Sequence, residues 1–228
     1  MKFQIERMAF KFLLNVLLSC RCPVSDNTEK KLINYYKRSA GKDVVNYESI
    51  LKIAEKEGKE TVFNKLREFC LYSINDFSKN RTILVNDILR HFCTAYHWHV
   101  VEESLPHTYK DLTDIPSWFV SHMLLPVELS ANGGTIQGTF IDSEGYIVLR
   151  NLFLPSDLKI REGSLYCVHF ASAIGEISLQ QSKLLRNHLA EIPDFQNLRK
   201  QVFEIDFHNF QRFGDYTSFC KERFGKYF

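Results

Sequence analysis

The N-terminal segment from Phe3 to Ser19 constrains the fold most, because it is apolar around most of a helical circumference. Its polar side chains fall mainly on one narrow line, at steps of three or four residues: Gln4, Arg7, Lys11, Asn15 and Ser19. A surface helix normally shows the reverse, an apolar stripe on a polar cylinder. The spacing therefore predicts a helix over residues 3–19 that is buried on most sides, by this chain or by another subunit. Membrane-surface binding is less favoured, because the polar line carries few cations.

The C-terminal segment is the second concentration of apolar surface. Aromatic residues recur there at every third position and continue to the end of the chain: Phe207, Phe210, Phe213, Tyr216, Phe219, Phe224, Tyr227 and Phe228. A step of three drifts around a helix, so these rings cannot form one stripe. We expect a turn that ends at Gly214, a closing helix over 215–224, and most rings in the core. Four rings are the candidates for binding a protein partner: Phe213, Tyr216, Phe219 and Phe224. Stacking on bases is the third alternative.

The segments between these ends predict an α+β fold. Apolar residues at helical spacing indicate helices over 25–39, 46–58, 60–77 and 82–96, so residues 1–104 are expected to form a helical bundle. Residues 105–228 are expected to form a smaller α+β part with a mainly antiparallel sheet. Its elements are a hairpin over 135–149, strands over 164–171 and 201–207, and a helix over 176–191. We expect the two parts to pack as one body.

Composition and charge exclude several classes of protein. The chain has 228 residues, of which 45% are hydrophobic and 25% charged, which is typical of a globular protein and not of a disordered one. The net charge is +2, divided as +4 over residues 1–104 and −2 over residues 105–228. Neither value indicates a general attraction to nucleic acid or to an anionic membrane. Nucleic acid is therefore a possible partner but not the favoured one.

The cysteines and the N-terminal segment give information about the cellular location of the protein. Six cysteines are scattered without the spacing of a disulfide scaffold, which favours reduced thiols and a cytoplasmic location. The basic and apolar N-terminus faintly resembles a signal peptide, but Glu6 and Asn15 interrupt that pattern. No run approaches the roughly 20 apolar residues of a spanning helix. We therefore expect no membrane association.

Residues 90–107 hold the densest group of chemically useful side chains. Four of them are of types that bind zinc: Cys93, His97, His99 and His107. Cys93 and His97 are four residues apart and share a helix face, but the local spacing brings no second close pair to them. Structural zinc sites usually contain two such pairs. The spacing therefore predicts no metal, and no other cofactor signature is present.

The same stretch holds a possible catalytic pair. Arg90 and His97 resemble the Arg-x4–6-His element of HEPN-type ribonucleases, with His91 in place of the polar residue that usually follows the Arg. In such a pair the Arg stabilises phosphate charge and the His moves protons, without a metal. The resemblance implies a catalytic site on RNA at Arg90 and His97, with His99 beside them as a third candidate.

No stretch forms a complete catalytic signature. Cys167 and His169 lie on one face of a predicted strand, where core packing is the expected role. Carboxylates are plentiful but form no Asp/Glu-x-Lys arrangement on neighbouring strands, and there is no phosphate loop. The leading interpretation is a non-enzymatic intracellular subunit or adaptor that binds a protein partner or a second copy. The alternative is a nucleic-acid-processing enzyme or effector, RNase-like, that uses residues 90–107. Whether the chain is an enzyme stays open.

Overall fold

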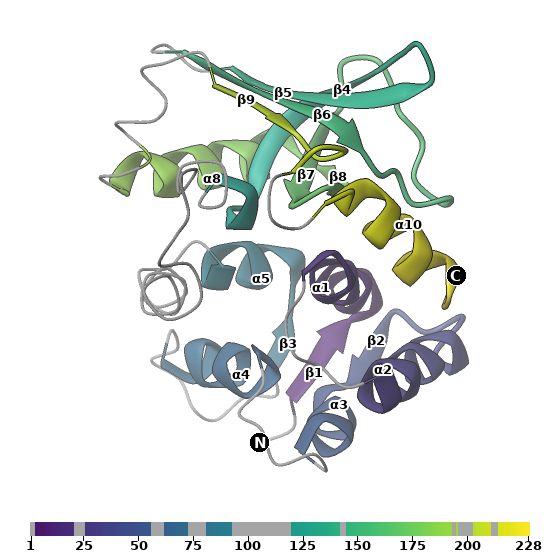
Figure 1. Ribbon diagram of the computed structural model, residues 1–228. Helices are drawn as coiled ribbons and strands as arrows, with labels where there is room; N and C mark the ends of the chain where they lie inside the picture. Colours follow the sequence, from purple (N-terminus) through teal and green to yellow (C-terminus); the bar gives the residue numbers. More distant parts are fainter. Residues whose placement is uncertain are drawn as a thin grey trace, which may run out of the picture. The chain divides into compact units, whose positions relative to one another are not determined.

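The fold contains both helices and sheets, as the sequence predicts for an α+β protein (Figure 1). The computed structural model describes residues 3–20, 26–55, 62–72, 81–92, 120–141, 145–192, 195, 203–210 and 214–228. The chain divides into two compact units. The first unit comprises Met1–Leu17, Arg21–His91 and Tyr227, and the second comprises Leu18–Cys20, Phe92–Lys226 and Phe228. The predicted boundary at residue 104 lies outside the described residues, and packing of the two parts as one body stays a prediction.

The N-terminal elements combine helices with a small sheet. In chain order they are β1 (Phe3–Glu6), α1 (Arg7–Ser19), α2 (Asp26–Arg38), β2 (Val44–Asn46), α3 (Tyr47–Glu55), α4 (Val62–Tyr72), β3 (Arg81–Ile83) and α5 (Val85–Phe92). Strand β1 lies in the middle of the sheet, antiparallel to β2 and parallel to β3. The predicted helices are present, but a helical bundle alone does not describe this unit, because the three strands were not predicted.

Strand β1 corrects the predicted start of the first helix. Phe3 and Ile5 are buried while Gln4 between them is exposed, which is the alternation of a strand. Four residues are too few for this period to be distinguished from helical spacing in the sequence. Pairing with β2 and β3 supplies the backbone hydrogen bonds, and the helix begins only at Arg7.

Helix α1 is buried on most of its circumference, which confirms that prediction. From Ala9 to Ser19 every side chain is buried except that of Lys11, which is intermediate. Burial includes Asn15 and Ser19, two members of the polar line, at 3% and 0% exposure. The exception is Met8, of which 68% is exposed. The helix therefore has one open position near its N-terminal end.

The second unit is built on a six-stranded sheet. Its elements are β4 (Leu125–Asn132), β5 (Thr135–Ile141), β6 (Tyr146–Leu152), β7 (Leu165–His169), β8 (Ser172–Ile177), α8 (Leu179–Glu191), β9 (Phe203–Asp206) and α10 (Tyr216–Gly225). The strand order is β8-β7-β4-β5-β6-β9. All neighbours are antiparallel except β6 and β9, which run parallel. The mainly antiparallel sheet is as predicted.

Two features of this sheet differ from the prediction. Strand β4 was not predicted, because Pro126 near its start is typical of interrupted structure. Pro126 fits because β4 pairs with β7 over Leu125–Glu128 but with β5 only from Glu128 onward, so no bond to β5 is lost. Glu176 belongs to β8 and not to the predicted helix. That helix, α8, begins after Ser178, which forms a capping box with Gln181.

Candidate functional site

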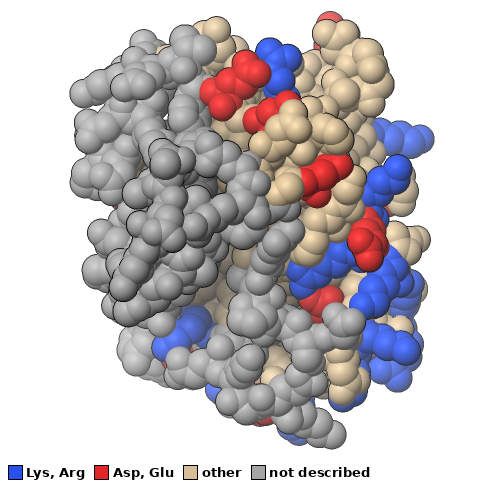
Figure 2. Space-filling model, viewed as in Figure 1, with Lys and Arg blue, Asp and Glu red and all other residues tan. Residues whose placement is uncertain are grey.

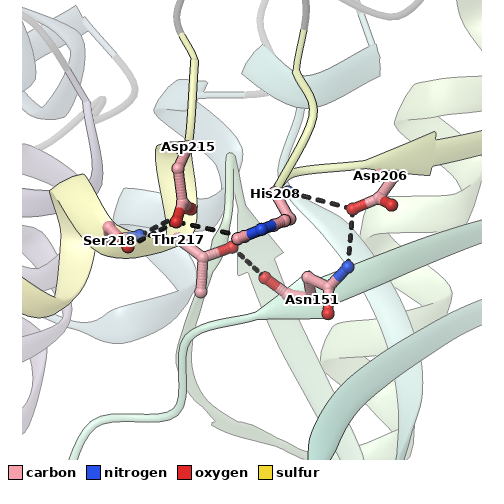
Figure 3. Close-up of polar contacts among 6 residues, drawn as sticks. All are labelled: Asn151, Asp206, His208, Asp215, Thr217 and Ser218. Carbon is pink, nitrogen blue, oxygen red and sulfur yellow. Dashed lines mark hydrogen bonds and ion pairs between the residues drawn. The ribbon is translucent and has the colours of Figure 1, made fainter.

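A group of polar side chains lies where β6, β9 and α10 meet, and we call it the C-terminal polar cluster (Figure 3). Its members are Asn151, Asp206, His208, Asp215, Thr217 and Ser218. The parallel pairing of β6 with β9 places Arg150 opposite Asp206, which brings Asn151 next to the end of β9. The short connection from β9 then leads to Asp215, the N-cap of α10.

Asp206 is the acceptor at one end of the cluster. Its Oδ1 accepts a hydrogen bond from the Asn151 side-chain amide at 2.6 Å and another from the backbone N–H of His208 at 2.9 Å. Asn151 has a φ of 58°, in the left-handed region that Asn tolerates better than most residues. Its carbonyl accepts a hydrogen bond from the Thr217 hydroxyl. These bonds tie β6 to the end of β9 and to the first turn of α10.

Asp215 is the acceptor at the other end. Its Oδ1 caps α10 by accepting the Ser218 backbone N–H at 2.9 Å. Its Oδ2 accepts the Ser218 hydroxyl and lies 3.0 Å from Nδ1 of His208. Burial by itself raises the pKa of Asp215, but the hydrogen bonds from Ser218 and the charge of His208 outweigh that effect. The pKa of Asp215 is therefore lower than its ordinary value.

The cluster contains one group that could take part in proton transfer. His208 is 60% exposed, and its Nδ1 is oriented by the Asp215 carboxylate. Nε2 forms no hydrogen bond or ion pair with the described residues. A carboxylate-oriented imidazole with an open Nε2 can act as a general acid or base. The same bonds also fix the connection between β9 and α10, which is a purely structural role.

The candidates from residues 90–107 are placed only in part. Arg90 is exposed on α5, directly after the buried Leu89. The other candidates, Cys93, His97, His99 and His107, lie outside the described residues. Their convergence into a catalytic or metal site therefore stays a prediction. In the part of the chain that the structure describes, no group of three or more His, Cys, Asp or Glu side chains could hold a metal ion.

The four aromatic candidates for partner binding have different environments. Tyr216 and Phe224 are buried at 1% and 3% exposure, and Tyr216 stacks on Phe170 with ring centroids 5.0 Å apart. Phe219 is half-buried, and the Arg223 guanidinium lies 5.6 Å from its ring centroid. Phe213 lies outside the described residues. Among the described candidates, only Phe219 offers appreciable ring surface to a partner.

The second unit buries the two residues, Cys167 and His169, for which the sequence predicts core packing. Cys167 and His169 are both buried, and Nδ1 of His169 lies 2.8 Å from the hydroxyl of Ser19. At 2% exposure, His169 has no access to a substrate. This pair therefore serves packing and hydrogen bonding in the core, as expected for residues 167 and 169.

Exposed apolar side chains gather at one end of the β5–β6 hairpin. Ile141 and Tyr146 are 57% and 42% exposed and face each other in the antiparallel register. We call them the hairpin-end pair. Arg186 of α8 donates a hydrogen bond to the Ile141 carbonyl, and its guanidinium lies 4.6 Å from the ring centroid of Phe140. Arg186 therefore lies beside the backbone of this hairpin end and over Phe140, whose side chain points to the opposite face of β5 from that of Ile141.

Comparisons with known proteins do not assign the chain to a family. No family model matches the sequence, and no curated protein or solved structure shows significant similarity to it. None of the helices within the described residues has both the length and the apolar character needed to cross a membrane.

Proposed function

We propose that this chain is a non-enzymatic subunit or adaptor within the cell that acts by binding another protein. The hairpin-end pair supports the proposal. Ile141 and Tyr146 expose neighbouring apolar surface, and the Arg186 guanidinium donates a hydrogen bond to the Ile141 backbone carbonyl. Aromatic and arginine side chains are enriched in protein interfaces, where a few well-covered residues supply most of the binding energy.

The strength of such an interface depends on covering both side chains together. Each Å² of apolar surface removed from water stabilises a complex by about 25 cal/mol, before the cost of association. Pairing across β5 and β6 holds Ile141 and Tyr146 side by side before binding, so little ordering is needed at this position. The partner is another protein or a second copy of this chain.

The test compares a double lysine variant at the hairpin-end pair with a single lysine variant at another exposed apolar residue. Ile141→Lys with Tyr146→Lys places charges on the hairpin-end pair. Leu179→Lys is the matched control, because Leu179 is 62% exposed at the start of α8. Light scattering measures self-association, and cross-linking followed by mass spectrometry identifies a bound protein. We expect the double variant to lose the complex and the control to retain it. Equal loss in both, or no complex with the native chain, contradicts the proposal.

A second function, acid–base catalysis on a nucleic acid, is favoured by one observation. His208 presents an open Nε2 while Asp215 holds its Nδ1. This group adds to the RNase-like alternative over residues 90–107, whose His residues lie outside the described part of the chain. Cleavage of labelled RNA without added metal tests this function. His208→Ala and His97→Ala should each abolish cleavage if the respective group acts. His188→Ala is the control, because His188 also faces a carboxylate, that of Glu191 at 3.7 Å.

A further inference from the structure

Helix α2 exposes a face made only of cations and amides. Six residues at positions i, i+3, i+4, i+7, i+10 and i+11 share it, and all are exposed: Asn27, Lys30, Lys31, Asn34, Lys37 and Arg38. We call this set the α2 face. Figure 2 shows Lys and Arg side chains gathered along the lower right edge, where α2 lies in Figure 1. Lys42, in the turn after the helix, is also exposed.

No carboxylate is known to lie on this face. Glu29 is buried at 4% exposure and accepts a hydrogen bond from the Tyr227 hydroxyl at 3.0 Å, within the first unit. The other acidic residue of α2, Asp26, is its first residue, and its side chain lies outside the description. Within the described residues, neither Lys30, Lys31 nor Arg38 forms an ion pair.

Three other cations of the first unit have acidic partners. The pairs are Arg81 with Asp87 at 2.9 Å, Arg67 with Glu48 at 3.5 Å and Lys65 with Glu68 at 3.5 Å. A solvated helix usually mixes charges of both signs in the same way. The α2 face differs from these three pairs, because the charges of Lys30, Lys31 and Arg38 are left unneutralised by the described residues over about two turns.

We propose that the α2 face binds the phosphate backbone of a double-stranded nucleic acid. Lys30 and Lys37, like Lys31 and Arg38, are seven residues apart, which is about 10 Å along a helix axis. The major groove of a DNA duplex is about 12 Å wide and has phosphates along both edges. Lys and Arg neutralise phosphates, and amide groups such as that of Asn34 donate hydrogen bonds to them.

The composition of the face argues against binding to an anionic membrane surface. A helix that binds a membrane surface inserts an apolar face, and the α2 face has no apolar member. Its lysines are point charges without a fixed fork, so the contact is expected to recognise the backbone and not the base sequence. This inference concerns the first unit and does not depend on the proposed role of the hairpin-end pair.

The test uses the full chain and mixed-sequence duplexes of DNA and RNA, with binding followed by fluorescence anisotropy. The variant carries Lys30→Gln, Lys31→Gln and Arg38→Gln. Lys37 is kept because it donates a hydrogen bond to the Tyr227 carbonyl. The control carries Lys52→Gln, Lys159→Gln and Lys183→Gln, which remove the same charge from exposed positions elsewhere. Circular dichroism confirms that both variants are folded.

We expect the native chain to bind at low salt and to weaken steeply as salt rises. The α2 variant should lose at least about tenfold in affinity. The slope of the logarithm of its binding constant against the logarithm of salt concentration should become less steep by about two to three. The control should lose less than about threefold. Equal losses in both variants, or no duplex binding at low salt, overturn the proposal. So does binding to phosphatidylserine vesicles or to an acidic polypeptide in preference to the duplexes.

Discussion

The two ends of the chain are both rich in apolar residues, but they bury them differently. In α1, burial extends around most of the helix and includes the polar Asn15 and Ser19. In α10, burial follows one stripe at steps of four residues, through Tyr216, Cys220 and Phe224. Lys221 and Glu222 between them and Gly225 after them are exposed. A high count of apolar residues therefore does not by itself indicate a surface for a partner, because α10 places most of its rings in the core.

The largest effect is expected at the centre of α1. Leu14 is 2% exposed, so Leu14→Asp places a carboxylate among apolar side chains without a partner. We expect a loss of at least about 4 kcal/mol in the free energy of unfolding, or no folded protein. Urea unfolding followed by circular dichroism measures it. The control, Leu14→Met, keeps the volume and should cost less than about 1.5 kcal/mol. An unchanged urea midpoint for Leu14→Asp would show that α1 is not enclosed.

The next largest effect should separate the two faces of α10. Phe224 is buried, with its ring centroid 5.0 Å from that of Phe153, so Phe224→Ala removes a packed ring. The expected cost is about 3–5 kcal/mol in the free energy of unfolding. Lys221→Ala, on the exposed side, should change it by less than about 0.5 kcal/mol. Similar costs for the two changes, measured by thermal and urea unfolding, would mean that the stripe does not exist.

Elements with strong local signals could be predicted from the sequence. Asn is a residue type that commonly caps helices, and the Asn46 side chain accepts the Ser49 backbone N–H at 3.0 Å before α3. The turn at Gly133 and Gly134 joins β4 to β5 with positive φ at both positions. In each case the residues that decide the conformation are within four positions of one another, so one sequence contains the necessary information.

Features that depend on distant residues could not be predicted. Asn151 and Asp206 are 55 residues apart, and Ser19 and His169 are 150 apart. Nothing in the local pattern of either residue indicates its partner. Strand β1 was missed for the same reason, because its identity depends on pairing with β2 and β3. The contact between the exposed His208 and Asp215 likewise could not be predicted, because it depends on where the end of β9 lies relative to the start of α10.

The α2 face is an intermediate case. Its spacing from Asn27 to Arg38 is visible in the sequence, but the net charge of +2 for the whole chain conceals it. Only the structure shows that Glu29 turns inward to bond Tyr227. Charge summed over a chain or over half of it therefore says little about a single helix face.

A smaller effect is expected at the start of α10. Asp215→Ala removes the N-cap and should cost about 1 kcal/mol at pH 7. The pKa of Asp215 is lower in the folded chain than its ordinary value, so its charge stabilises the fold above that value. This contribution is lost as the pH falls through the folded pKa. The difference in urea midpoint between native chain and variant should therefore shrink below about pH 4. Glu162→Ala, at an exposed position, is the control, and a difference that grows with acid contradicts the assignment.

The smallest effect is expected at the open position of α1. Met8 is 68% exposed, so Met8→Lys should change the free energy of unfolding by less than about 0.5 kcal/mol, although Leu14 on the same helix tolerates no charge. Light scattering of the native chain and the variant provides the second measurement. If a second subunit covers this position, the lysine becomes a buried charge, and the complex should dissociate or the urea midpoint should depend on protein concentration. If the two proteins have the same molecular mass in solution and the same free energy of unfolding, α1 is enclosed without a partner at Met8. A loss above about 1 kcal/mol would instead make this end of α1 an interface, and the contrast with α10 would then be that only α1 requires another chain.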